Sequence, residues 1–273
     1  MTTSVHPTAV IDPSAELDRG VKVGAHAVIG PRVEIGADSE IGPGAFIEGP
    51  TRMGRENRVF SAACIGFEPQ DLKFTGEESW LEIGDGNHFR EFCTVQRGTA
   101  HGGGITRIGD NNLFMVYTHI AHDCQVGSRS VFVNNATLAG HVTVHDDATI
   151  GAFSSVHQFC RIGRHGYIGG YSVITRDTLP FVKTVGMKPS CYGVNRIGLE
   201  RKGFSPETLK HLSSAYRILV RSRLKTSNAV GLLREEHGDV PEVLELIEFV
   251  ESSQRGVIMD LPGNKGARGG SDG

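Results

Sequence analysis

The chain has 273 residues, of which 38% are hydrophobic and 22% charged, and this composition predicts a folded protein rather than a disordered or collagen-like one. Its formal net charge of −3 argues against the strongly basic surface of a nucleic-acid-binding domain. We find no signal peptide, no apolar run near the about 20 residues that span a bilayer, and no CxxC pair among the five cysteines. We therefore expect a cytoplasmic protein without an integral membrane segment or a disulfide framework.

Aliphatic or aromatic residues recur at every sixth position through the first two thirds of the chain. The series runs from Val5 to Ile65, from Ile83 to Val95 and, after a slip of one residue, from Ile108 to Ile174. A period of six matches neither the period of an α-helix nor the alternation of a single strand. Three hexapeptides instead form a triangular coil whose apolar side chains point inward, and stacked coils pair as parallel strands. The sequence therefore predicts a parallel β-helix over residues 1–190.

Two segments interrupt the repeat and are predicted to be loop insertions. Residues 66–82 place Asp71 and Glu77 where the repeat requires inward-facing apolar side chains. Residues 96–107 contain three consecutive glycines and shift the frame by one residue. Long insertions in a repeat protein are usually found where function requires them, so both loops are candidates for part of a site. The alternative is that each is an ordinary solvated loop.

The repeat stops near residue 190, and the rest of the sequence predicts a C-terminal α-helical domain over residues 191–258. Residues 205–207, Ser-Pro-Glu, have the pattern of an N-cap, a first-turn proline and a first-turn acid. Apolar residues at three- and four-residue spacings follow in 208–224 and again in 240–250, which indicates amphipathic helices. The tail, residues 259–273, is predicted to be disordered.

Three histidines are predicted to lie on one edge of the β-helix. Subtracting one coil of 18 residues places His141 at position 123, and subtracting two coils places His157 at position 121, so both fall within one residue of His122. His119 lies just before them. Convergent histidines indicate either a metal site or a general base with polar supporting groups. The alternative is three unrelated surface histidines.

A general base on this edge would suit acyl transfer to a hydroxyl. The hydroxyl must lose its proton as it attacks a thioester, and histidine is well matched to that task near neutral pH. Asp123 is a candidate to hold the tautomer of His122, although neighbouring side chains in a strand point to opposite faces. The backbone N–H of Gly140, next to His141, is a candidate donor to the developing oxyanion.

The segments HIAHDC (119–124), NNATLAGH (134–141) and VHQF (156–159) closely resemble the UDP-N-acetylglucosamine acyltransferases, which catalyse the first step of lipid A biosynthesis. Further family segments follow in the same order: QDLK (70–73), RGT (97–99), GGG (102–104), GVN (193–195) and RKGFS (201–205). The resemblance covers residues 5 to about 220. It implies a left-handed β-helix, which is an exception to the right-handed crossover rule, and a homotrimer.

The resemblance also implies an activity and its residues. A 3-hydroxyacyl group would move from the phosphopantetheine of acyl carrier protein to the 3-hydroxyl of UDP-N-acetylglucosamine, with no metal, no other cofactor and no covalent intermediate. His122 would be the base, supported by Asp123, and Gly140 would hold the oxyanion. The residues implied in sugar and acyl binding are Asp71, Lys73, His119, His141, His157 and Gln158, and those implied in nucleotide binding are Asn195, Arg201 and Lys202.

Two positions depart from the family pattern. Ile197 stands where the family often has Glu, and Lys202 stands where it has Arg. Isoleucine accepts no hydrogen bond, and lysine lacks the planar donor fork of arginine, so the nucleotide contacts should differ from those of the family. Gly170 aligns with the position that limits acyl-chain length, and its missing side chain predicts room for a longer chain. Basic residues expected to meet the acidic carrier protein are Arg217, Arg221 and Arg223.

Three other functions are compatible with a histidine-bearing β-helix. One is another hexapeptide-repeat acyltransferase, either an N-acyltransferase, which usually has an additional N-terminal domain, or an acetyl- or succinyltransferase. The second is a zinc carbonic anhydrase on the same fold, although no two histidines here are five residues apart as in that family. The third is an inert scaffold or binding module, because a fold alone does not specify a function.

Overall fold

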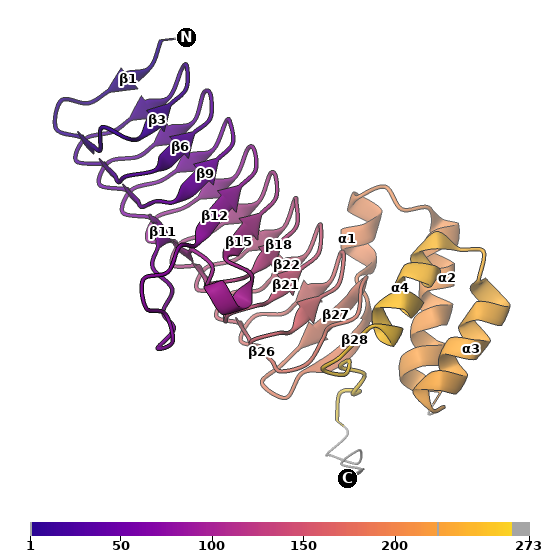
Figure 1. Ribbon diagram of the computed structural model, residues 1–273. Coiled ribbons are helices and arrows are strands. Elements are labelled where there is room, and N and C mark those ends of the chain that lie inside the picture. The colour runs from indigo at the N-terminus through magenta and orange to yellow at the C-terminus, as the bar shows by residue number, and fades with distance from the viewer. Residues whose placement is uncertain (1, 223, 264–273) are drawn as a thin grey trace.

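The computed structural model describes residues 2–222 and 224–263, which form a long triangular prism of short strands followed by a group of helices at its C-terminal end (Figure 1). Each coil contributes one strand to each of three sheets, which we call A, B and C. We name each corner by the sheets it joins in chain order, so that the B–C corner leads from sheet B to sheet C. As far as β26, successive strands occupy A, B and C in turn, as the period of six predicts.

The strands are short, and their order in each sheet follows the coils. Sheet A contains β1 (Ser4–Val5), β4 (Lys22–Val23), β7 (Glu40–Ile41), β10 (Arg58–Val59), β13 (His88–Phe89), β16 (Leu113–Phe114), β19 (Val131–Phe132), β22 (Thr149–Ile150), β25 (Tyr167–Ile168), β27 (Val182–Val185) and β28 (Ser190–Val194). Sheet B contains β2 (Val10–Ile11), β5 (Val28–Ile29), β8 (Phe46–Ile47), β11 (Cys64–Phe67), β14 (Thr94–Gln96), β17 (His119–Ile120), β20 (Thr137–Leu138), β23 (Ser155–Val156) and β26 (Val173–Ile174). Sheet C contains β3 (Glu16–Leu17), β6 (Val33–Ile35), β9 (Thr51–Met53), β12 (Trp80–Ile83), β15 (Ile105–Ile108), β18 (Gln125–Val126), β21 (Thr143–Val144) and β24 (Arg161–Ile162).

Parallel pairing between coils sets the register, and the apolar repeat fills the interior. His119 pairs with Thr137 one coil later, and only β27 and β28 pair in antiparallel fashion among the described strands. From Val23 onward the repeat positions are buried, whereas Val5 is 43% exposed because no earlier coil covers it. Phe89, Phe114 and Phe132 occupy the interior on three successive coils, and their rings stack with centroids 4.8 Å apart.

The corners repeat one backbone conformation. In most coils, one residue of the corner has a positive φ, including Asp123 at 61° and His141 at 62° on the B–C corner. Non-glycine residues adopt this left-handed region uncommonly, and Asn, Asp and His do so more readily than most. Glycines occupy corner positions where coils approach closely, since a Cβ at Gly151 would lie 2.5 Å from the backbone nitrogen of Gly170. The stacking of coils therefore constrains the corner sequences as well as the interior.

The two insertions leave the B–C corner and are shorter than the sequence predicts. Strand pairing continues to Phe67 and resumes at Trp80, so the first irregular segment is 68–79 rather than 66–82. The second is 97–104 rather than 96–107, and it includes the turn η1 (Ala100–Gly102). The two insertions are joined at Trp80, whose N–H donates to Gly104 O at 2.8 Å and whose carbonyl accepts from Gly98 N at 3.1 Å.

The helical region contains α1 (Arg196–Arg201), α2 (Pro206–Tyr216), the π-helical turn η2 (Arg217–Arg221), α3 (Thr226–His237) and α4 (Pro241–Glu251). The predicted N-cap is confirmed, because Ser205 Oγ accepts from Thr208 N at 3.0 Å. The helix predicted over 240–250 is also confirmed, whereas α1 and α3 were not predicted. The prediction of disorder from residue 259 onward is wrong for Asp260, because its carbonyl accepts a hydrogen bond from Cys191 N at 2.7 Å. Residues 264–273 lie outside the described residues.

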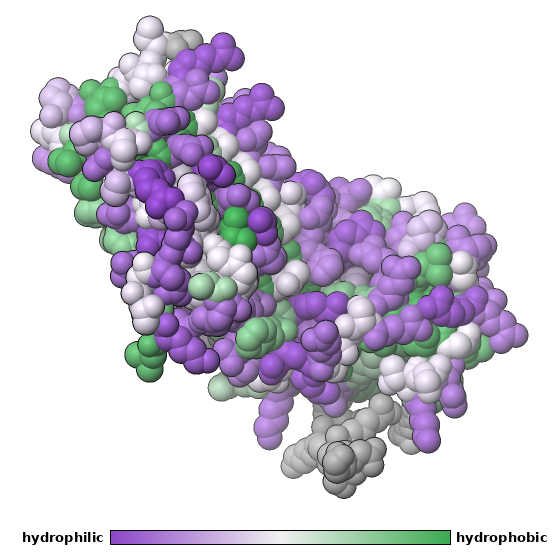
Figure 2. All heavy atoms as spheres, in the orientation of Figure 1, coloured by the Kyte–Doolittle hydropathy of each residue, from purple (hydrophilic) through white to green (hydrophobic). Residues whose placement is uncertain are grey.

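The surface of the molecule is predominantly polar. Figure 2 shows hydrophilic side chains over much of the visible face of the prism and of the helices, interrupted by separate hydrophobic groups. Within residues 2–222 and 224–263, no helix combines the length and the apolar character that a membrane crossing requires.

Candidate active site

The B–C corner after β17 places His122 beside Asp123. Nδ1 of His122 lies 2.8 Å from Oδ2 of Asp123, and the carboxylate side chain is fully buried. Because a carboxylate only accepts hydrogen bonds, Nδ1 carries the proton in this pair. In the neutral ring, this tautomer leaves Nε2 as the atom that can take a proton from a substrate.

Asp123 is held by the second insertion. Thr99 N donates to Oδ1 at 2.8 Å, Thr99 Oγ donates to Oδ2 at 2.7 Å, and the N–H of Asp123 itself donates to Thr106 Oγ1 at 2.7 Å. Charge-assisted hydrogen bonds of this kind are about twice as strong as neutral ones. Sequence reasoning missed both threonines. Thr99 belongs to the RGT segment of the family resemblance, which was a signal that it lies at the site.

Gly140 lies one coil above His122. A Cβ at Gly140 would lie 2.5 Å from Cε1 and 2.8 Å from Nε2 of His122, so the imidazole packs directly on the glycine backbone. In the part of the chain that the structure describes, the Gly140 N–H donates no hydrogen bond. A backbone N–H without an acceptor, in a residue that packs against the His122 ring, is available as an oxyanion donor.

The predicted histidine ladder is only partly present. Asp123, His141 and Phe159 occupy the same corner position on successive coils, and the rings of His141 and Phe159 stack at 4.4 Å. His141 meets His122 edge to face at 5.2 Å. His157, in contrast, is exposed and lies 3.3 Å from Arg255 Nη2. The structure therefore shows contact between His122 and His141, and it places His157 on the same corner without a contact to either of them in the described residues.

The first insertion brings Asp71 to the site. Asp71 Oδ2 lies 3.1 Å from Nε2 of His101, and the ring of His101 lies 6.1 Å from that of His141. A hydrogen bond from Lys73 N, followed by the nearby imidazoles of His101 and His122, lowers the pKa of Asp71. His101 was not predicted, although the expectation that residues 96–107 emerge near the ladder pointed to it. Lys73 is exposed.

Two site histidines are held neutral by their surroundings. His119 contacts Thr94 Oγ1 at 2.7 Å, and burial, reinforced by His122, lowers its pKa. Burial also lowers the pKa of His141, against the opposing effect of the Asp123 carboxylate. Neutral imidazoles can donate and accept hydrogen bonds, which suits polar contacts to a sugar or an amide.

In residues 2–222 and 224–263, one group of side chains of the kinds that bind metals lies close together. His122, Asp123 and His141 each offer one potential ligand atom, and these atoms lie within 4.8 Å of one another. Both Asp123 oxygens, however, already accept hydrogen bonds from Thr99, and Oδ2 also accepts from His122. The donor set therefore fits a hydrogen-bonded acid–base centre better than a metal site, which needs free ligand lone pairs.

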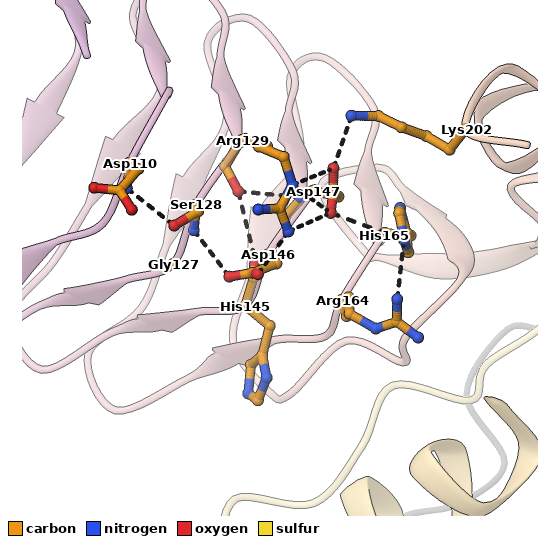
Figure 3. Close-up of polar contacts among 12 residues, drawn as sticks. Asp110, Gly127, Ser128, Arg129, His145, Asp146, Asp147, Arg164, His165 and Lys202 are labelled. Carbon is orange, nitrogen blue, oxygen red and sulfur yellow. Dashed lines mark hydrogen bonds and ion pairs between the residues drawn. The ribbon is translucent and has the colours of Figure 1, made fainter. Parts of the chain in front are cut away.

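Two of the residues expected to bind nucleotide, Asn195 and Lys202, lie at the two ends of α1 and contact the C–A corner. Figure 3 shows Lys202 reaching Asp147, and Nζ lies 2.7 Å from Oδ1 of that carboxylate. Arg129 Nη2 lies 3.0 Å from Oδ2 of Asp147, and hydrogen bonds from Arg129 and Lys202 outweigh burial and lower the pKa of Asp147. Asn195 Nδ2 donates to the carbonyl oxygen of His165 at 3.2 Å. Arg201 is exposed at the end of α1.

The remaining predicted residues, Gly170 and Gln158, are exposed. Gly170 lies on the A–B corner, is exposed, and has only Ala152 backbone atoms near the position of a Cβ, the closest being the oxygen at 3.2 Å. Gln158 is exposed on the B–C corner. Within one chain, the three predicted groups therefore occupy three different corners of the prism: catalytic residues on B–C, nucleotide residues on C–A and Gly170 on A–B.

Comparison with known proteins gives consistent matches along the chain. A family model described as Udp N-acetylglucosamine O-acyltransferase, domain 2, matches residues 177–258, and a bacterial transferase hexapeptide model matches residues 14–49, 105–140 and 141–176. The acyl-[acyl-carrier-protein]–UDP-N-acetylglucosamine O-acyltransferase of Herminiimonas arsenicoxydans is 46% identical over 258 residues, which cover 93% of this chain and 98% of that protein. The Xylella fastidiosa protein of the same name is 48% identical over 258 residues, covering 93% and 97%.

Solved structures agree with these matches. The UDP-N-acetylglucosamine acyltransferase of Francisella novicida superposes with a TM-score of 0.92 at 34% identity and 95% coverage of both chains. The UDP-N-acetylglucosamine O-acyltransferase of Moraxella catarrhalis gives a TM-score of 0.90 at 41% identity, covering 93% of this chain and 99% of that one. The predicted fold, a left-handed parallel β-helix of hexapeptide repeats followed by a small α-helical region, is thereby confirmed. The matches favour one of the functions considered above, and the chain belongs to the UDP-N-acetylglucosamine O-acyltransferase family of enzymes.

Proposed function

We propose that the protein transfers a 3-hydroxyacyl group from acyl carrier protein to the 3-hydroxyl of UDP-N-acetylglucosamine. The names of its relatives specify an acyl carrier protein donor and a UDP-N-acetylglucosamine acceptor. The observation that carries the proposal is the buried Asp123 beside His122 Nδ1 at 2.8 Å, with Gly140 packed against the same ring. This arrangement supplies a base and an oxyanion donor without a nucleophilic side chain between them.

The reaction then proceeds by direct attack. His122 Nε2 takes the proton of the sugar 3-hydroxyl as its oxygen attacks the thioester carbonyl of the acyl donor. Asp123 stabilises the imidazolium, and the Gly140 N–H stabilises the oxyanion of the tetrahedral intermediate. Collapse of the intermediate breaks the carbon–sulfur bond, and the imidazolium returns its proton to the departing phosphopantetheine thiolate. The step needs no metal and no further cofactor.

The substrate is bound by polar groups around this centre. Asp71 and His141 flank the ring of His101, and both lie on the side of the B–C corner where the insertions emerge. With His119 they would orient the sugar and the acyl carbonyl. We assign Lys73, His157 and Gln158, which are exposed near the same corner, to contacts made only when substrate is present.

The functional enzyme is proposed to be a homotrimer. Catalytic, nucleotide-binding and acyl-length residues lie on different corners of one prism, and a rigid prism cannot bring its own corners together. Packing of the B–C corner of one copy against another copy would combine them in a single cleft. Asn195, Arg201 and Lys202 would then reach the nucleotide, with Lys202 leaving Asp147 to meet a phosphate.

The carrier protein is proposed to dock on the helical region near η2. Arg217 and Arg221 supply positive charge there, which suits an acidic partner. Arg223 lies outside the described residues. We place the reaction in the cytoplasm, because Cys64, Cys93, Cys124, Cys160 and Cys191 are all free thiols, as expected in a reducing compartment.

A transfer assay tests this proposal. Purified protein is incubated with UDP-N-acetylglucosamine and a panel of 3-hydroxyacyl carrier proteins, and acylated sugar nucleotide is measured. We expect turnover with at least one donor and a loss of about 10²- to 10⁴-fold in kcat for His122→Ala, the contribution typical of a general base. His88→Ala, on sheet A, is the control. Retained turnover in His122→Ala would refute the base assignment, and stoichiometric zinc in active enzyme would overturn the metal-free mechanism.

A further inference from the structure

We propose that Thr99 is a positioning residue, which acts through Asp123 to fix the protonation pattern of His122. The proposal rests on the proposed function, and it assigns a catalytic purpose to the second insertion, residues 97–104. Thr99 is fully buried and makes two hydrogen bonds to the Asp123 carboxylate, one from its N–H at 2.8 Å and one from its hydroxyl at 2.7 Å.

The hydrogen-bond directions in this network have one solution. Thr99 Oγ1 lies near Gly102 N, which can only donate, and 3.4 Å from His101 Nε2, which carries a proton because it faces the Asp71 carboxylate. Asp123 Oδ2 can only accept, so the hydroxyl proton points to that carboxylate. With the hydroxyl and the N–H of Thr99 both donating, the carboxylate is fixed in rotation. Oδ2 then has one direction left for His122, and it accepts the proton on Nδ1. Nε2 is left as the basic atom.

The insertion is built to hold Thr99 in this position. Thr99 is the N-cap of η1, since its hydroxyl accepts from Gly102 N at 3.2 Å, and its carbonyl accepts from Gly104 N at 2.7 Å. A Cβ at Gly102 would overlap Asp123 Cγ, so the first glycine of the triplet allows the loop to close directly over the carboxylate. The base of the loop is fastened to Trp80 by Gly98 and Gly104.

This geometry makes the inserted loop different from a substrate-binding lid. Thr99 makes its buried contacts to the carboxylate that supports the base, Arg97 donates to the carbonyls of Gly49 and Gly66, and His101 reaches the open side of the corner, toward Asp71 and His141. We infer that loss of the Thr99 hydroxyl lowers kcat with little change in KM for either substrate, because its short hydrogen bond, at 2.7 Å, is to Asp123, whereas its contact with His101 Nε2 is longer, at 3.4 Å.

Three variants test the inference. Thr99→Val keeps the shape and the backbone N–H but removes the hydroxyl, Thr99→Ser restores it, and Thr178→Val is the matched control. Thr178 is also fully buried, and its hydroxyl has no hydrogen-bond partner in the described residues. We expect Thr99→Val to lower kcat by about 10- to 100-fold, the loss of one hydrogen bond to a charged group, while Thr99→Ser and Thr178→Val stay within about threefold of the parent.

A double-mutant cycle separates positioning from a general structural effect. In the Asp123→Asn background, Thr99→Val should cause little further loss of kcat, because the group through which Thr99 acts has already been changed. Equal losses in both backgrounds, or a rise in KM that accounts for the whole effect, would refute the inference. Far-ultraviolet circular dichroism and thermal melting establish that each variant is folded.

The outcomes also separate this inference from the proposed function. If the parent enzyme shows no transfer, the proposed function fails. If the parent is active and His122→Ala is inactive, but Thr99→Val retains the kcat of the parent, only the role of Thr99 is overturned. If Thr99→Val does not fold, Thr99→Ala replaces it as the variant without a hydroxyl. The inference then predicts a lowered kcat for Thr99→Ala and a kcat near that of the parent for Thr99→Ser.

Discussion

The imidazole of His122 and the carboxylate of Asp123 meet at 2.8 Å although the two residues are adjacent in the sequence. Adjacent side chains in an extended strand point to opposite faces and do not meet in this way. At the B–C corner, the positive φ of Asp123, 61°, turns its side chain to the same side as that of His122. The corner of the β-helix, rather than the strand, therefore creates the base.

Gly140→Ala should inactivate the enzyme while leaving the coil intact. The new Cβ would lie 2.5 Å from His122 Cε1, so the imidazole must shift away from Asp123 and from the site of the oxyanion. We expect kcat to fall by about 10²- to 10³-fold, as for loss of an oxyanion donor. Gly231→Ala, in open space on α3, should leave kcat unchanged. An active Gly140→Ala enzyme would contradict the assigned role of this glycine.

Gly170→Met should shorten the preferred acyl chain. Gly170 is exposed on the A–B corner, and the tightest contact of a Cβ there, 3.2 Å to Ala152 O, requires only a small adjustment. The longer side chain would then occupy space that the end of the acyl chain needs. Competition between 3-hydroxyacyl carrier proteins of different lengths measures the shift, with Gly231→Met as the control. Unchanged selectivity would show that Gly170 does not limit chain length.

Phe114→Ala should destabilise the centre of the β-helix. Phe114 is fully buried between Phe89 and Phe132, with both ring centroids 4.8 Å away. Truncation leaves a cavity that neighbouring coils cannot close, and the free energy of unfolding should fall by about 3–5 kcal/mol. Phe114→Leu should cost less, because most of the volume is retained. Urea unfolding measures both, and a cost below about 1 kcal/mol for the alanine variant would show that the coils relax into the space.

Stability should fall as the pH drops below about 6.5. Burial lowers the pKa of His119, His141, His145 and His165 in the folded protein, so the unfolded chain binds more protons in this range. The free energy of unfolding is therefore unaffected above the histidine pKa of the unfolded chain, and it declines as the pH falls through that pKa. Carboxylates titrate at lower pH and contribute little in this window.

Thermal melting between about pH 7.5 and about pH 5.5 measures this decline. His145→Gln removes one buried titrating group and should reduce the slope of the melting temperature against pH. A slope equal to that of the parent would mean that His145 does not contribute to the linkage.

The architecture of this protein follows from its sequence pattern. A period of six in apolar residues has one common structural solution, and it predicted the three-sheet prism, the inward-facing column and the place of the insertions to within a few residues. The helix cap at Ser205 followed from local chemistry, because its hydroxyl bonds to a backbone N–H only three residues away. The helix α3 was missed because its apolar spacing is weaker than that of α2 and α4.

How the site is assembled depends on contacts that exist only in the folded chain. A spacing of 18 residues places His122, His141 and His157 on one corner, and the structure shows which side chains meet there, since His141 contacts His122 and His157 contacts Arg255. The contacts from Thr99 to Asp123 and from His101 to Asp71 join an insertion to a coil and to the other insertion. Such contacts have no sequence period, because they are set by how an irregular loop folds back in space.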